Sequence, residues 1–182
     1  MKAEHSARTT RLAAAPPLGR LAAFALDVAT YAIIPVLLVP VGLLLIRNGV
    51  MLSSVAVNAI GLAFVIAPAT VWAAWRETRP RAATPGKRLL RLKVLDDKTE
   101  ALPSAQRSLA RNMIKIAVPW ELGHTVALGY AYQRGDAVPS WLLILTAILY
   151  GWLLVNLILL MIPSHKPLHD RLAHTIVVRT AN

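Results

Sequence analysis

Cysteine is absent from the 182 residues, and acidic residues are few, nine against twenty lysines and arginines. Without cysteine the chain has no disulfide, no thiolate-bound metal and no cysteine nucleophile. Charged residues make up only 16% of the chain, against roughly 25% in soluble domains, whereas apolar residues make up 56%. This hydrophobicity excludes a disordered chain, and a soluble core of this size could not bury so much apolar surface. Composition therefore favours an integral membrane protein.

Three long runs of the chain are almost free of charge. They cover residues 21–46, where Asp27 is the only charged residue, 50–75 and 140–162. Each is longer than the roughly 20 residues that a helix needs to cross the hydrocarbon core of a bilayer. The first run is too long for a cleaved signal peptide, and no cleavage site of small residues follows it. We therefore expect all three runs to be transmembrane helices of the protein.

A fourth, weaker run over 116–132 contains Glu121 and His124, and its length is the lower limit for a membrane span. The distribution of positive charge supports it. With four spans, eighteen lysines and arginines lie on the side of both termini, eleven of them in segment 76–115, and two lie on the other side. Because cytoplasmic segments carry the excess of positive charge, both termini are predicted to be cytoplasmic. The net charge of +11 then reflects orientation, and we expect no nucleic-acid partner.

Two segments on the cytoplasmic side show the composition and alternation typical of strands, around residues 90–95 and 175–179. Two strands alone are marginally stable, so we expect a small ribbon supported by the helices. Residues 104–115 predict an amphipathic helix that lies in the membrane interface and leads into the third span. The predicted fold is thus an all-α membrane protein with four transmembrane helices, a short amphipathic interfacial helix and a small cytoplasmic β ribbon.

Three motifs, in order along the chain, resemble those of the RDD family of bacterial membrane proteins. They are Leu18-Gly19-Arg20 with Asp27, Thr84-Pro85-Gly86-Lys87, and Leu168-His169-Asp170-Arg171-Leu172-Ala173-His174-Thr175, where His174 replaces the family's glycine. The resemblance covers residues 18–179, between a flexible basic cytoplasmic N-terminus, 1–17, and a C-terminal end, 180–182. It implies a multi-pass protein of the bacterial plasma membrane with an undefined biochemical activity, and sodium/proton exchange has been associated with some relatives.

Asp27 is the most informative single residue, because a charged aspartate inside a span is costly and needs a partner, water or a proton. Two interpretations are open. Asp27 is either an ion or proton site, or part of a buried ion pair that orders helix packing. Arg20, seven residues earlier on the same face, either approaches Asp27 through water or pairs with Asp170 of the tail.

Glu121 and His124 share a face of the weak span and form either a proton relay or a shallow pair that reaches interfacial water. The polar residues Asn58 and Asn156 are expected to hydrogen-bond between helices. The tail histidines and Asp170 resemble a zinc-ligand set only weakly. We therefore expect neither a metal nor a cofactor, and no enzyme motif supports catalysis.

The function stays open between two classes. One is a cation- or proton-coupled transporter that uses Asp27, with Arg20, Asp170, Glu121 and His124 as further site residues. The other is a non-catalytic membrane scaffold that binds partners or lipid, and a homo-oligomer is compatible with both. Basic residues are expected to contact anionic lipid heads on the cytoplasmic side. They are Lys87, Arg88, Arg91, Lys93, Arg107, Arg111 and Lys115.

Overall fold

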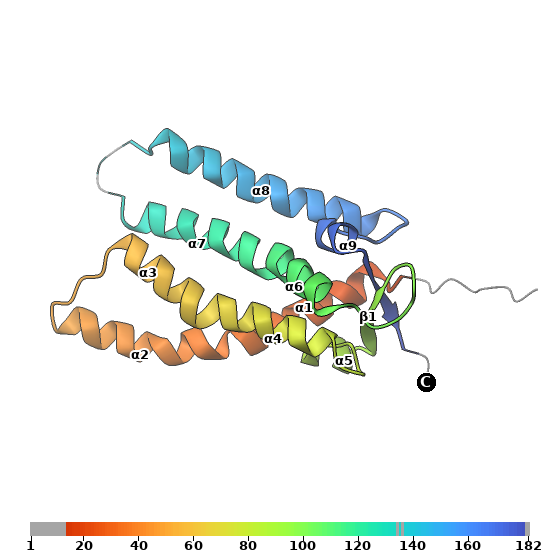
Figure 1. The fold of residues 1–182 in the computed structure, drawn as a ribbon. Helices are drawn as coiled ribbons and strands as arrows, with labels where there is room; N and C mark the ends of the chain where they lie inside the picture. Colours follow the sequence, from red (N-terminus) through yellow and green to blue (C-terminus); the bar gives the residue numbers. More distant parts are fainter. Residues whose placement is uncertain (1–13, 134, 136, 181–182) are drawn as a thin grey trace, which may run out of the picture.

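A computed structural model describes residues 14–133, 135 and 137–180, most of which are helical (Figure 1). The helical elements are α1 (Pro17–Tyr31), α2 (Ile33–Arg47), α3 (Ser54–Gly61), the π-helical turn η1 (Leu62–Ile66), α4 (Ala67–Glu77), α5 (Pro85–Leu89), α6 (Ala105–Asn112), the π-helical turn η2 (Met113–Ala117), α7 (Val118–Ala131), α8 (Ser140–Met161) and α9 (Leu168–Leu172). Two strands, β1 (Leu92–Asp96) and β2 (Thr175–Arg179), accompany them.

Three helices among the described residues are long and apolar enough to cross a membrane: Pro17–Arg47, Ser54–Glu77 and Ser140–Met161. They confirm the three uncharged runs as candidate spans. A fourth long helix runs through α6, η2 and α7 but does not reach the same hydropathy, because Lys115, Glu121 and His124 lie within it. The fourth span over 116–132 therefore stays a prediction.

The long helix Pro17–Arg47 is interrupted at Ala32, which separates α1 from α2. Pro35 explains the interruption. Proline has no N–H to donate to the carbonyl of Tyr31 four residues earlier, and its ring crowds that carbonyl. Pro40 lies inside α2 without ending it, as membrane helices allow.

Each of the two π-helical turns is followed in sequence by a proline. Pro68 follows η1 by two residues and Pro119 follows η2 by two residues. A π turn widens the helix where proline removes a hydrogen bond. The helices Ser54–Glu77 and Ala105–Ala131 therefore continue through their prolines instead of ending there.

The long helices run alongside one another as a bundle, with α7 in contact with both α3 and α8 (Figure 1). At one end of the bundle lie α5, α9 and the two strands. The described N-terminal end also lies there, because Ala14 pairs with Val178 and the N–H of Ala15 donates to the carbonyl of Val177 at 2.7 Å. Both described ends of the chain therefore lie on the same side of the bundle, and we call this the sheet side.

The predicted ribbon is confirmed. Strands β1 and β2 pair antiparallel, from Leu92 opposite Arg179 to Asp96 opposite Thr175. Leu92 and Val94 are buried against Ala15 and Ala23 of the N-terminal segment. The sheet is thus supported by α1, as a two-stranded ribbon requires.

The predicted helix over 104–115 is also present as α6 and η2, and it begins at a cap in which the hydroxyl of Ser104 accepts from the N–H of Arg107. Its orientation differs from the prediction. Arg111 is only 1% exposed, whereas the apolar residues Leu109 and Met113 are 38% and 50% exposed. Arg111 and Asn112 point into the protein because they meet the buried carboxylate of Glu77 there. Leu109 and Met113 point outward, whereas Ile116 is buried.

Candidate functional site

The three motifs meet in one buried polar network on the sheet side of the bundle. Asp27 of α1 is completely buried. The hydroxyl of Thr84 donates to its Oδ2 at 2.5 Å, and the N–H of Gly86 donates to its Oδ1 at 2.8 Å. The Nζ of Lys87 lies 3.8 Å from Oδ2. The Thr-Pro-Gly-Lys segment therefore satisfies both oxygens of the aspartate on α1.

Gly86 lets the two segments approach this closely. A Cβ atom at this position would lie 2.2 Å from the carbonyl oxygen of Ala23 and 2.9 Å from Oδ1 of Asp27. The first contact is with backbone, which cannot swing away. Only glycine allows α5 to lie against α1 with its N–H directed at the carboxylate.

Glu77, the last residue of α4, is the second carboxylate of the network and is also completely buried. The Nζ of Lys87 donates to its Oε1 at 3.0 Å, and Nη1 of Arg111 donates to the same oxygen at 2.6 Å. The amide of Asn112 donates to Oε2 at 2.8 Å. Sequence analysis missed Glu77. Its position as the first acidic residue after an uncharged run was the available signal.

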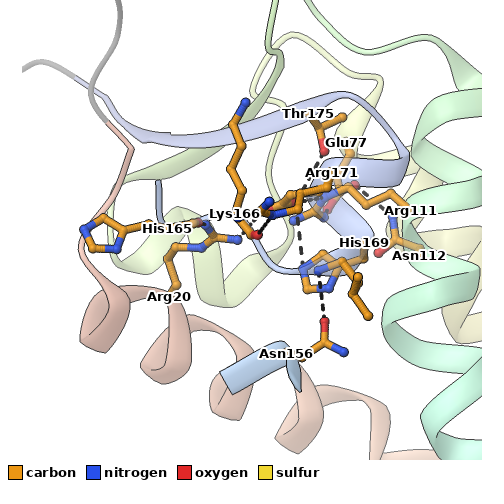
Figure 2. A network of polar contacts seen from close by, with 12 residues as sticks. Arg20, Glu77, Arg111, Asn112, Asn156, His165, Lys166, His169, Arg171 and Thr175 are labelled. Carbon is orange, nitrogen blue, oxygen red and sulfur yellow. Dashed lines mark hydrogen bonds and ion pairs between the residues drawn. The ribbon is translucent and has the colours of Figure 1, made fainter. Parts of the chain in front are cut away.

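Asp170 of α9 is the third carboxylate. Its Oδ2 pairs with Nη2 of Arg20, and its Oδ1 accepts from Nε of Arg111 at 2.8 Å and from the hydroxyl of Thr175 at 3.3 Å. Burial alone would raise the pKa of Asp170, but the Arg111 and Arg20 guanidiniums hold that pKa well below its usual range. Figure 2 shows side chains from α1, α4, α6 and β2 converging around α9.

The network contains three carboxylates, Asp27, Glu77 and Asp170, and three paired cations, Arg20, Lys87 and Arg111. Its formal charge is zero. Buried charges are tolerated when they are paired and hydrogen-bonded, and removing one member leaves an uncompensated charge. The arrangement joins α1, α4, α5, α6 and α9, which are distant in sequence.

The motifs that build this network belong to a known family pattern. The model of the RDD family matches residues 14–174. The chain belongs to the RDD family. No curated protein and no solved structure matches it.

The buried polar network of this RDD-family chain shows which of its two expected partners Arg20 has. Arg20 pairs with Asp170 and also donates to the carbonyl of His165. The carboxylate of Asp27 instead takes Thr84, Gly86 and Lys87 as its partners, as given above. The arginine and the aspartate of α1 thus serve two different carboxylate sites of the same network.

Glu121 and His124 of α7 form a separate cluster with Asn58 of α3. The amide of Asn58 donates to Oε1 of Glu121, and its carbonyl oxygen lies 2.7 Å from Nδ1 of His124. The second oxygen of Glu121 is buried without a hydrogen-bond partner in the described structure. The expectation that Asn58 bonds between helices is confirmed, and so is that for Asn156, whose Oδ1 accepts from the N–H of Leu168 on α9.

The three histidines of the tail have different surroundings. Nδ1 of His165 lies 2.9 Å from the carbonyl oxygen of Leu160, and His174 is exposed. Nε2 of His169 lies 3.8 Å from Oδ1 of Asp170, and burial lowers the pKa of His169 well below its usual range. Within residues 14–133, 135 and 137–180, no group of three histidine or acidic side chains is placed to hold a metal.

Seven cations were expected to contact lipid heads, and this expectation is wrong for two of them because they are buried. Lys87 is 4% exposed and Arg111 is 1% exposed, since both neutralise carboxylates of the network. Arg88 and Arg91 are exposed on the sheet side, and Lys93 is half-buried. Arg107 is half-buried and pairs with Asp96. Lys115 is half-buried beside the ring of Phe24.

Proposed function

We propose that this RDD-family chain is a non-catalytic scaffold of the bacterial plasma membrane with four spans and both termini in the cytoplasm. Its sheet side, with Arg88, Arg91 and Lys93, is the face that meets anionic lipid heads and partners, which include a second copy of the chain. The observation that carries the proposal is the engagement of Asp27. Both of its oxygens already have partners, as described above.

An ion-coupled mechanism at Asp27 would need a cation or proton to displace these partners. Displacing them would remove one of the two carboxylates that balance Lys87. Leaving a buried positive charge less well balanced is costly. A network that is neutral and fully buried is better suited to holding helices together than to exchanging ions. This supports the structural interpretation of Asp27 over the transport interpretation.

The four-span topology is supported by the position of the chain ends. Ala14 lies beside Val178 on the sheet side, so a chain that spans the membrane between them crosses it an even number of times. Three helices of the described part of the chain are candidate spans, and in this proposal α7, which contacts both α3 and α8, supplies the fourth crossing. The excess of positive charge on the sheet side supports a cytoplasmic location for that side.

The proposal is tested by comparing Asp27→Asn with the wild type in liposomes that enclose a pH-sensitive dye. We expect no cation-dependent pH change with the wild type, and a lower Tm for the variant in detergent. Asp97→Asn, which changes a partly exposed aspartate paired with Lys166, is the matched control and should leave the Tm nearly unchanged. Flux by the wild type that Asp27→Asn abolishes without loss of folded protein would contradict the scaffold.

A second function, proton-coupled transport through α7, is favoured by one observation. The buried Oε2 of Glu121 has no hydrogen-bond partner among the described residues, as expected of a carboxyl that takes up a proton within the membrane. In the same liposomes, Glu121→Gln would then abolish the pH change while Asp97→Asn would not. Absence of flux in the wild type over several pH values would count against this second function.

A further inference from the structure

A cavity of about 290 Å³ lies between α1, η2 and α8, next to the buried network. Its volume is just below the range of small-molecule sites, which begins at about 300 Å³. The end of the cavity nearest the sheet is formed by Leu92 of β1 and Val177 of β2. The cavity therefore begins at the sheet side and extends along two of the candidate spans.

The walls of the cavity are apolar and reach the outer surface of the bundle. Leu21 and Phe24 of α1 form one wall, and Leu153 and Leu157 of α8 form the opposite one. All four side chains are also exposed on the outside of the protein. Because α1 and α8 belong to candidate spans, this side of the cavity faces the acyl chains of the bilayer.

The inner end of the cavity is cationic. Arg20, Lys87, Arg111 and Lys115 all line it. The first three are the cations that balance the three carboxylates of the network. Lys115 is the fourth, and its Nζ lies 4.8 Å from the centre of the Phe24 ring. Among the residues that the structure describes, no carboxylate forms an ion pair with Lys115. Burial, together with Lys87 and Arg111, lowers the pKa of Lys115 well below its usual range, so an anion beside this side chain would stabilise its charged form.

We propose that this cavity binds one anionic membrane phospholipid, with its phosphate at Lys115 and the start of an acyl chain between α1 and α8. Lys115, the cavity lysine without a carboxylate partner among the described residues, can be balanced by the single negative charge of a phosphodiester headgroup such as that of phosphatidylglycerol. The apolar walls and the opening towards the bilayer favour a lipid over a soluble anion, which would leave those walls in contact with water. An ammonium group away from bulk water attracts an anion more strongly than one on the surface.

This site is distinct from the exposed cations of the proposed scaffold face. The surface residues would hold many headgroups weakly and in a salt-dependent way, whereas the cavity would hold one lipid per chain. The inference does not depend on whether the protein is a scaffold or a transporter.

The test uses the full chain in mild detergent and counts bound lipid by native mass spectrometry. Phosphatidylglycerol, phosphatidylcholine and a free fatty acid are titrated separately. We expect one molecule of phosphatidylglycerol per chain, and at least fivefold weaker binding to Lys115→Gln. Lys98→Gln, which removes an exposed lysine of the turn after β1, should bind like the wild type, and Lys115→Arg should restore binding.

A second pair of variants tests the apolar part without changing charge. Leu157→Trp fills the cavity, whereas Leu154→Trp adds the same bulk on an exposed position of α8 that does not line it. We expect only Leu157→Trp to lose the phospholipid while both variants keep the Tm of the wild type. Equal binding by all variants, equal binding of phosphatidylcholine, or saturation by the fatty acid alone would overturn the proposal.

Discussion

Arg20 and Arg111 approach Asp170 from α1 and α6, so a single carboxylate joins two helices to the tail of the protein. The charged residues of the family motifs can be buried because the residues of opposite charge that pair with them are buried as well. A carboxylate shared by two guanidiniums cannot be replaced by a neutral isostere without leaving positive charge unbalanced.

We therefore expect Asp170→Asn to destabilise the protein by about 3–5 kcal/mol, the range for breaking a buried ion pair. Chemical unfolding in detergent would measure it. The control is Asp97→Asn in the partly exposed pair with Lys166, whose side chains are 17% and 24% exposed, and for which a smaller loss than for Asp170→Asn is expected. Similar losses for both variants would show that burial does not decide the strength of these pairs.

Gly86 provides a steric test of the same network. In Gly86→Ala, the new methyl group would overlap the carbonyl of Ala23, so α5 must move away from α1 and lengthen the bond to Asp27. We expect a loss of roughly 1–3 kcal/mol, as for overpacked cores, and a clear decrease in Tm.

The matched control for this substitution is Gly151→Ala in α8, where nothing lies within 4 Å of the added methyl group. Alanine favours the helix by about 1 kcal/mol over glycine, so its Tm should stay the same or rise. A Gly86→Ala protein as stable as the wild type would mean that α5 does not pack against α1 as described.

At the scale of elements, the turn between α9 and β2 contains an unfavourable residue. His174 has a φ of +52°, in the left-handed region where glycine is favoured at the end of a helix. The resemblance to the RDD family places a glycine there. His174 is one of five non-glycine residues with a positive φ among those that the structure describes, and it is the one that stands where the family has glycine.

His174→Gly should relieve this strain and stabilise the protein by about 0.5–1 kcal/mol, because a non-glycine residue in this conformation costs about 1–2 kcal/mol and glycine loses more entropy on folding. The side chain is exposed, so few contacts are lost. A higher Tm in detergent would support the explanation, and His174→Ala, which keeps a Cβ atom, should not produce it.

Helix α9 also predicts how stability depends on pH. Burial lowers the pKa of His169 well below its usual range, although Asp170 acts in the opposite direction, and Arg111, Lys115 and Arg20 add to the lowering. The unfolded chain binds a proton near pH 6.5 that the folded chain does not, so stability falls as the pH decreases below about 6.5. Below about pH 4 the lowered pKa of Asp170 has the same effect, because the unfolded carboxyl is protonated first.

We expect the Tm to decrease between pH 7 and pH 5, and His169→Gln, which cannot be protonated, to flatten this part of the curve. The decrease below pH 4 should persist in that variant because Asp170 is still present. An identical curve for the variant and the wild type between pH 7 and pH 5 would assign the decrease to another group.

At the scale of the whole molecule, the meeting of both described ends on the sheet side ties the topology to the network. A tail that carries Asp170 to Arg20 must return to the side where α1 begins. The pairing therefore supports the even number of crossings that we propose between these residues. The polar residues of α7, which lower its hydropathy, meet Asn58 of α3 inside the bundle instead of facing lipid.

Reporter fusions test this topology directly. A reporter at the C-terminus should be active in the cytoplasm, and one inserted near Gly135 should be active outside, because α7 ends and α8 begins at the far end of the bundle (Figure 1). A C-terminal reporter outside the cell would mean that α7 does not cross the membrane.

Much of the fold could be predicted because its signals are local. The three uncharged runs, the ribbon of 90–95 with 175–179 and the helix over 104–115 were all expected, and the structure contains them. The candidate site was predicted less completely. The importance of Glu77 and the inward direction of Arg111 were missed, because burial of a charged side chain depends on a partner that a helical period does not identify.

The amino-acid sequence by itself determined that the chain is rich in membrane-compatible helices, and it identified three motifs of the RDD family. Hydropathy, periodicity and turn residues act over a few neighbours, so they can be read along the chain. Only the tertiary structure decided which charges meet. Arg20 pairs with an aspartate 150 residues away instead of the one seven residues along its own helix. An ion pair requires atoms within about 4 Å, and helix packing alone brings residues so distant in sequence to that separation.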